Sequence, residues 1–121
     1  MGLGKHILSL NVRGLRDRKK RQEVFRWLKK HQNGSDSIIF LQETHTDDKD
    51  LATWEREWQS KVIMAHGTTS SRGVAILLPK NINFSITNTA TDSNGRKSVM
   101  IIKDDDTEFC FINIYAPTQN M

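Results

Sequence analysis

Two side chains with ligand-type oxygens, Asn11 and Glu43, follow the apolar runs 7–10 and 38–41. If these runs are parallel neighbouring strands, both side chains lie at the carboxyl end of a sheet, where open α/β sheets bind ligands. A carboxylate beside a carboxamide suits a hard cation such as Mg²⁺, which often uses only one or two protein carboxylates. A metal held there could polarise a phosphoryl group. The competing interpretation is that both residues are turn formers or helix caps.

The elements that must position these residues follow from hydrophobic spacing. Apolar residues at helical spacing and a preceding Asp17, a plausible N-cap, predict a helix over 18–31, and a second set predicts one over 50–59. Trp27, Trp54 and Trp58 are expected in the helix–sheet core, and Cys110 is expected to be buried. Alternating or continuous apolar runs predict seven strands, at 7–10, 37–42, 61–65, 74–78, 82–89, 99–102 and 108–115.

This order, β-α-β-α and then strands, predicts a mixed α/β (α+β) fold: one mixed β-sheet with two helices on one face. The runs 38–41 and 74–78 do not alternate, which indicates that both faces of the sheet are apolar. Two helices can cover one face, so something else must cover the other.

Composition narrows the class of protein. The 121 residues are 36% hydrophobic and 26% charged, as in one globular domain. We expect an intracellular protein, nuclear or cytoplasmic, because no signal peptide or membrane-spanning run is visible and the single cysteine cannot form an intramolecular disulfide. Nine of the eighteen Lys and Arg residues fall between positions 13 and 30. Such a stripe either attracts a polyanion or forms a solvated helix face.

Five segments occur in an order similar to that of a known superfamily: LNVRGL (10–15), FLQETH (40–45), SRGVAILL (71–78), DSNGR (92–96) and FINIYAPT (111–118). They resemble the endonuclease/exonuclease/phosphatase superfamily, and within it the apurinic-type endonuclease domain of LINE-type non-LTR retrotransposons. The resemblance implies a nuclease that acts on DNA with Mg²⁺ or Mn²⁺. It assigns catalytic roles to Asn11, Glu43 and Tyr115, with Glu43 and Asn11 at the metal.

The same resemblance gives DNA-phosphate contacts to basic residues that border the expected cleft, which are Arg13, Arg16, Arg72 and Arg96. Asp92 and Gly95 match a D-x-x-G-R turn, which we take as structural. His45 matches no catalytic position, and we expect a structural or supporting role for it.

The resemblance also implies a full domain about twice this length, a four-layered α/β sandwich of which residues 1–121 form the N-terminal half. The downstream G-D-x-N segment and the terminal Asp-His pair are not in this sequence. We therefore expect one incomplete domain with little or no turnover by itself. Its uncovered sheet face is expected to be completed by a homodimer.

Three functions stay open on the sequence alone. The first is a Mg²⁺-dependent DNA endonuclease segment. The second is a non-catalytic, homodimeric nucleic-acid-binding module derived from a retroelement. The third is a phosphatase acting on small or lipid phosphates, which the basic helix and the LINE-like motifs favour least.

Overall fold

The computed structural model describes residues 6–31 and 37–116. It contains two helices, α1 (Arg18–His31) and α2 (Leu51–Trp58). Its seven strands are β1 (His6–Asn11), β2 (Ser37–Gln42), β3 (Val62–Ala65), β4 (Val74–Leu77), β5 (Ser85–Thr91), β6 (Lys97–Asp104) and β7 (Thr107–Ile114). All nine predicted elements are therefore present. None of the helices within the described residues is long and apolar enough to cross a membrane.

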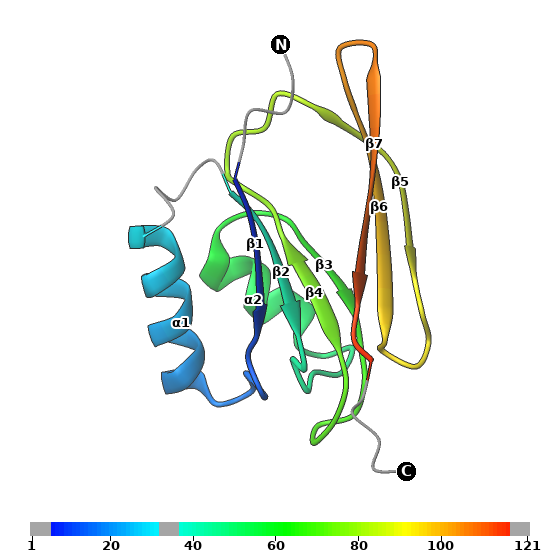
Figure 1. The fold of residues 1–121 in the computed structure, drawn as a ribbon. Coiled ribbons are helices and arrows are strands. Elements are labelled where there is room, and N and C mark those ends of the chain that lie inside the picture. The colour runs from blue at the N-terminus through cyan, green and yellow to red at the C-terminus, as the bar shows by residue number, and fades with distance from the viewer. Residues whose placement is uncertain (1–5, 32–36, 117–121) are drawn as a thin grey trace.

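The first four strands form one mixed sheet in the order β1-β2-β4-β3. β1 and β2 are parallel, and β4 is antiparallel to both β2 and β3. This arrangement confirms the mixed sheet and the parallel pair that carries Asn11 and Glu43. Helices α1 and α2 cover one face of this sheet, as predicted (Figure 1).

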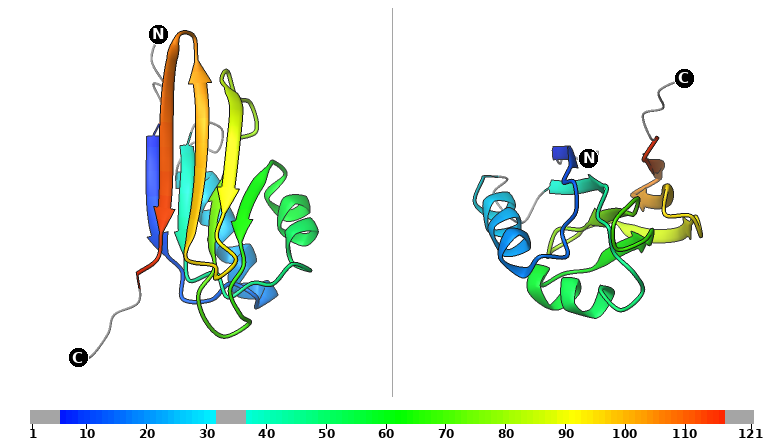
Figure 2. Two further views of the ribbon diagram at one scale, coloured as in Figure 1. Left: turned by 90° about the vertical axis from the view of Figure 1, so that its right-hand side faces the viewer. Right: turned by 90° about the horizontal axis from the view of Figure 1, so that it is seen from below.

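The last three strands differ from the prediction because they form a separate antiparallel sheet, β5-β6-β7. This second sheet packs on the free face of the first, so the molecule has three layers: helices, four-stranded sheet, three-stranded sheet (Figure 2). The expectation of a single sheet is wrong in this respect. The physical reason lies in β6, where alternate residues such as Met100 and Ile102 are fully buried against the first sheet.

Strand β2 shows why both faces of the first sheet are apolar. Ile39 and Leu41 pack toward the helices, whereas Ile38 and Phe40 pack toward the second sheet. Over β2, β3 and β4, the face that was expected to stay uncovered is thus covered by strands of the same chain, whereas Ile7 on β1 is 50% exposed. A homodimer through that face therefore loses its structural basis.

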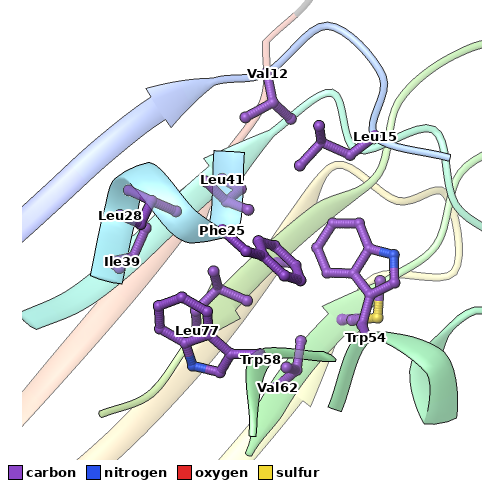
Figure 3. Close-up of a cluster of buried hydrophobic side chains, with 12 residues drawn as sticks. Val12, Leu15, Phe25, Leu28, Ile39, Leu41, Trp54, Trp58, Val62 and Leu77 are labelled. Carbon is purple, nitrogen blue, oxygen red and sulfur yellow. The ribbon is translucent and has the colours of Figure 1, made fainter. Parts of the chain in front are cut away.

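The helical side of the core is built around aromatic rings (Figure 3). Phe25 of α1 meets Trp54 and Trp58 of α2 edge to face, with ring centroids 5.4 and 5.5 Å apart. The Trp58 indole also donates to the Leu78 carbonyl at 2.8 Å, which fixes α2 on the sheet. The predictions for Trp54 and Trp58 are confirmed.

Two burial predictions are wrong. Trp27 is 47% exposed, because the buried stripe of α1 runs through Phe25 and Leu28, and Trp27 projects beside that stripe. Cys110 is exposed as well. It pairs with Ile101 on β6, so it lies on the outer face of the second sheet, opposite the buried alternate residues.

Candidate active site at the strand ends

Asn11 and Glu43 meet at the carboxyl ends of β1 and β2. The register pairs Asn11 with Gln42, so Glu43 is the first residue beyond the pairing. The Asn11 side-chain amide donates to a Glu43 carboxylate oxygen at 2.6 Å. The other end of the Asn11 amide accepts from the Arg13 backbone N–H at 3.1 Å. Asn11 therefore orients the carboxylate and is itself oriented by the following loop.

Tyr115 reaches the same place from the second sheet. It follows β7, whose end lies beside the ends of β1 and β2 (Figure 1). Its backbone N–H donates to the Arg96 carbonyl at 2.8 Å. A cleft of about 680 Å³ opens between the strand ends, and Asn11, Glu43 and Tyr115 all line it. The three residues predicted to be catalytic are thus brought together, although their roles stay predictions.

The backbone around this cleft adopts left-handed conformations at residues other than glycine. φ is 52° at Arg13, 58° at Glu43, 57° at His45 and 61° at Arg72. Such conformations are uncommon for non-glycine residues and persist only where neighbouring structure imposes them. Four of them on the loops that meet at one rim mark it as a specialised part of the fold.

Backbone hydrogen bonds between the loops impose this geometry. The Glu43 carbonyl accepts from Gly14 at 2.6 Å, and the Thr44 N–H donates to the Gly73 carbonyl at 3.0 Å. His45 donates in the same way to Arg72 at 2.9 Å. The loops after β1, after β2 and before β4 are therefore tied to one another directly behind the Glu43 carboxylate.

The turn with Asp92 and Gly95 supports these loops. The Asp92 carboxylate accepts from the Asn94 N–H at 2.8 Å, and its carbonyl accepts from Gly95 at 3.1 Å. The Gly95 carbonyl then accepts from Gly73 at 2.8 Å. A Cβ on Gly95 would lie 2.5 Å from the His66 carbonyl oxygen, and φ is +70°, so glycine is required there. The structure places both residues in a turn, as predicted.

The four arginines predicted to contact DNA occupy different environments. Arg13 is exposed on the loop after Asn11, and Arg96 is exposed beside Tyr115. Arg72 is half-buried, and its Nε donates to the Asn94 carbonyl at 2.8 Å. Arg16 forms ion pairs with Asp50 and Asp47, at 3.3 and 3.9 Å. The Arg16 guanidinium is therefore already engaged by two carboxylates, which makes it the least available of the four.

Sequence reasoning missed Asn113 and Gln42. Asn113 is 2% exposed in β7, and its amide donates to the carbonyls of Leu41 and Ala75 at 3.2 and 2.9 Å. Gln42 donates to the Asn113 side-chain oxygen at 2.9 Å and to the Ser9 hydroxyl at 3.0 Å. These bonds join the two sheets at the base of the cleft. A carboxamide inside the apolar alternation FINIY was the available signal.

His45 lies against Glu43, with Nε2 3.8 Å from the carboxylate. Its ring also packs on Gly14, whose missing Cβ would stand 2.7 Å from the His45 Nδ1. The imidazole thus fills the space between the loop after β1 and the Glu43 carboxylate. This contact agrees with a supporting position for His45 and does not place it in the cleft lining.

The donor set fits a weakly held Mg²⁺ and not a closed metal cage. Among the residues that the structure describes, no three His, Cys, Asp or Glu side chains gather into a metal site. Glu43 is the one carboxylate in the described lining of the cleft. Mg²⁺ keeps several waters and is often bound through one carboxylate and substrate phosphates, so an open cleft with one oriented carboxylate suits it.

Comparison with known proteins agrees with this geometry. The chain is 30% identical over 112 residues to the "Transposon TX1 uncharacterized 149 kDa protein" of Xenopus laevis. That alignment covers 93% of this chain and 8% of the relative, so the chain spans a small part of the relative's length. Residues 8–119 match the description "Endonuclease/Exonuclease/phosphatase family". The chain therefore belongs to the endonuclease/exonuclease/phosphatase family.

Proposed function

We propose that this chain carries the metal- and phosphate-binding cleft of a Mg²⁺-dependent DNA endonuclease domain of retrotransposon type. The observation that carries the proposal is the convergence of Asn11, Glu43 and Tyr115 in one cleft, with the Asn11 amide 2.6 Å from the Glu43 carboxylate. The similarity to a transposon protein favours DNA over small phosphates as the substrate. The place of action would then be inside the cell, in the nucleus or the cytoplasm.

Each residue has a distinct part in this proposal. Glu43 would hold the cation, and Asn11 keeps the carboxylate turned toward the cleft. The Tyr115 hydroxyl would contact the scissile phosphate. Arg13 and Arg96 would bind flanking phosphates through charge-assisted hydrogen bonds of their guanidinium groups. When bound, the metal polarises the phosphoryl group and stabilises the leaving oxygen.

Turnover by residues 1–121 alone should be low. Within the described lining of the cleft, the ionisable side chains are Glu43 and Tyr115. A positioned general acid or base typically contributes ~10²–10⁴-fold in rate, and among residues 6–31 and 37–116 no second carboxylate or histidine lines the cleft to supply it. We therefore expect metal-dependent DNA binding to be measurable under conditions in which cleavage is slow or absent.

Nicking of supercoiled plasmid with Mg²⁺, measured together with DNA binding, tests the proposal. Glu43→Gln removes the charge yet leaves an oxygen that can accept from Asn11, so it should abolish the metal-dependent part of both signals. Glu23→Gln, which removes an exposed carboxylate on α1, is the matched control and should change neither. If the two variants behave alike, the cleft is not the metal site.

The non-catalytic module remains the second candidate, because the outer face of the second sheet is apolar and exposed. Ile112 and Ile114 are 51% and 58% exposed, and Val99 and Ile101 lie beside them on the same face. An exposed patch of this kind promotes association. We propose that two copies meet through this outer face, which replaces the covered face as the dimer surface. Absence of nicking with salt-sensitive DNA binding retained would favour this candidate.

A further inference from the structure

A second concave surface lies in the helical layer, between the C-terminal half of α1 and the end of α2, with a volume of about 720 Å³. We call it the basic groove, because four cations line it, which are Arg26, Lys29, Lys30 and Arg56. The carboxylate in its described lining belongs to Glu57. That carboxylate is held by two nitrogens of Arg21, at 2.5 and 3.1 Å, so its charge is shared with a residue outside the lining and offsets the lining cations only in part.

Lys29 shows that the positive charge in this groove is fixed and crowded. Its ammonium donates to the Glu57 carbonyl at 3.1 Å and lies 5.3 Å from the centre of the Trp58 ring. Burial, and then the charge of nearby Lys80, lower the pKa of Lys29. A like charge next to a partly desolvated ammonium costs free energy, which an anion in the groove would recover.

The basic groove is distinct from the cleft. Within the part of the chain that the structure describes, the two linings share no residue. The groove is lined by residues of the helices and by the residue that follows α2, and the helices lie on the face of the four-stranded sheet that points away from β5–β7 (Figures 1 and 2). The cleft is instead lined by residues at the ends of β1, β2 and β7. A ligand can therefore occupy the groove without entering the cleft.

We propose that the basic groove binds the phosphodiester backbone of a nucleic-acid strand, independently of the cleft that contains Glu43. Four cations from two helices converge on one open surface, and several fixed cations together suit a repeating polyanion better than a single small anion. Arg26 and Lys30 are one helical turn apart and exposed, so both can reach phosphates. The ligand class rests on the proposed function, but the surface does not.

The test uses labelled duplex DNA and single-stranded RNA of equal length, with binding followed by fluorescence anisotropy across a salt series. Arg26→Gln/Lys30→Gln removes two groove charges, and Lys49→Gln/Lys103→Gln removes two exposed charges that line neither surface. We expect the groove pair to weaken binding of at least one probe about tenfold and to lower the salt slope by up to about two. The control pair should stay within about twofold. The probe whose binding the groove pair weakens shows whether the groove prefers duplex DNA or single-stranded RNA.

Lysine acetylation of the unaltered protein, read by mass spectrometry, gives an independent measurement. Nucleic acid should protect Lys29 and Lys30 while Lys49 stays reactive, also in Glu43→Gln, where the cleft has lost its carboxylate. The proposal is overturned if both double variants weaken binding equally, or if nucleic acid leaves the groove lysines unprotected. Because protection in Glu43→Gln does not depend on the metal site, failure of the proposed function is distinguishable from failure of this inference.

Discussion

At the scale of single residues, the orientation of Glu43 depends on a short series of backbone contacts. Glu43 holds φ at 58°, a conformation that costs on the order of 1–3 kcal/mol for a residue with a side chain. The Thr44 N–H donates a hydrogen bond to the Gly73 carbonyl, and the Gly73 N–H donates one to the Gly95 carbonyl. The strain at Glu43 is thus sustained by a turn that lies some fifty residues further along the chain. A change in that turn should reach the cleft although it touches no ligand.

Gly95→Ala tests how strongly the fold depends on this turn. The added Cβ would meet the His66 carbonyl at 2.5 Å and the Gly67 nitrogen at 2.6 Å, both of them backbone atoms that cannot move aside cheaply. We expect a loss of about 2 kcal/mol in the free energy of unfolding, measured by urea denaturation. Ser93→Ala, in the exposed part of the same turn, should change it by less than about 0.5 kcal/mol. Equal urea midpoints for the two variants would contradict this account.

At the scale of elements, hydrophobic spacing predicted the helices and strands well, because buried side chains recur with the period of the helix or of the strand that carries them. It located α1 and α2, the parallel pair β1–β2, and so the meeting of Asn11 with Glu43. It did not predict how strands distant in sequence are arranged, and it therefore missed that β5–β7 form their own sheet. Similarly, the ion pairs of Arg16 and the buried bonds of Asn113 depend on neighbours distant in sequence.

The two helices are joined by an ion pair between buried Arg21 and half-buried Glu57, which gives a pH-dependent prediction. The Arg21 guanidinium is buried, holds the Glu57 carboxylate at 2.5 Å and also donates to the Leu15 and Arg16 carbonyls. The hydrogen bond from Arg21, which outweighs the effect of burial, lowers the pKa of Glu57 below its ordinary value of 4.5. Because the folded-state pKa is the lower one, this stabilisation is present above pH 4.5 and is lost as the pH falls through the folded-state pKa.

Glu57→Gln should lower the free energy of unfolding at pH 7 by about 2 kcal/mol, since it leaves the buried Arg21 without its charge partner. The difference from the unaltered protein should shrink as the pH falls from 4.5 through the folded-state pKa, because the unfolded chain then binds a proton at Glu57 that the folded chain does not. Thermal or urea unfolding across a pH series measures this. Glu23→Gln, on the exposed side of α1, serves as the control. A difference that is constant with pH would exclude the ion pair as its cause.

At the scale of the whole molecule, the three layers expose two surfaces that favour binding, one basic and one apolar. The helical layer presents the basic groove, and the outer face of the second sheet presents apolar side chains. The helices and the second sheet lie on opposite sides of the four-stranded sheet (Figure 2), so nucleic acid and a second copy of the chain need not compete for one site. The cleft lies between them, at the rim where both sheets end.

The outer face also carries charge at its two ends, which selects an orientation for self-association. Lys97 stands beside Ile114 at one end, and the acidic turn 104–106 closes the other. Two copies stacked antiparallel about a two-fold axis would place each basic end near the partner's acidic turn while the isoleucines pack together. This arrangement buries the apolar patch and pairs opposite charges, whereas a parallel stack would place like charges together.

Sedimentation at micromolar concentration should therefore show a dimer that Ile112→Thr/Ile114→Thr weakens at least about tenfold, since four buried isoleucines per dimer become threonines that still suit a strand. Ile7→Thr/Ile82→Thr removes two isoleucines that are 50% and 38% exposed elsewhere and should leave the dimer intact. Added salt should weaken the unaltered dimer further, because the end charges are exposed. A well-folded monomer at all these concentrations would remove self-association from the account and leave the basic groove unaffected, because Ile112 and Ile114 line the cleft but not that groove.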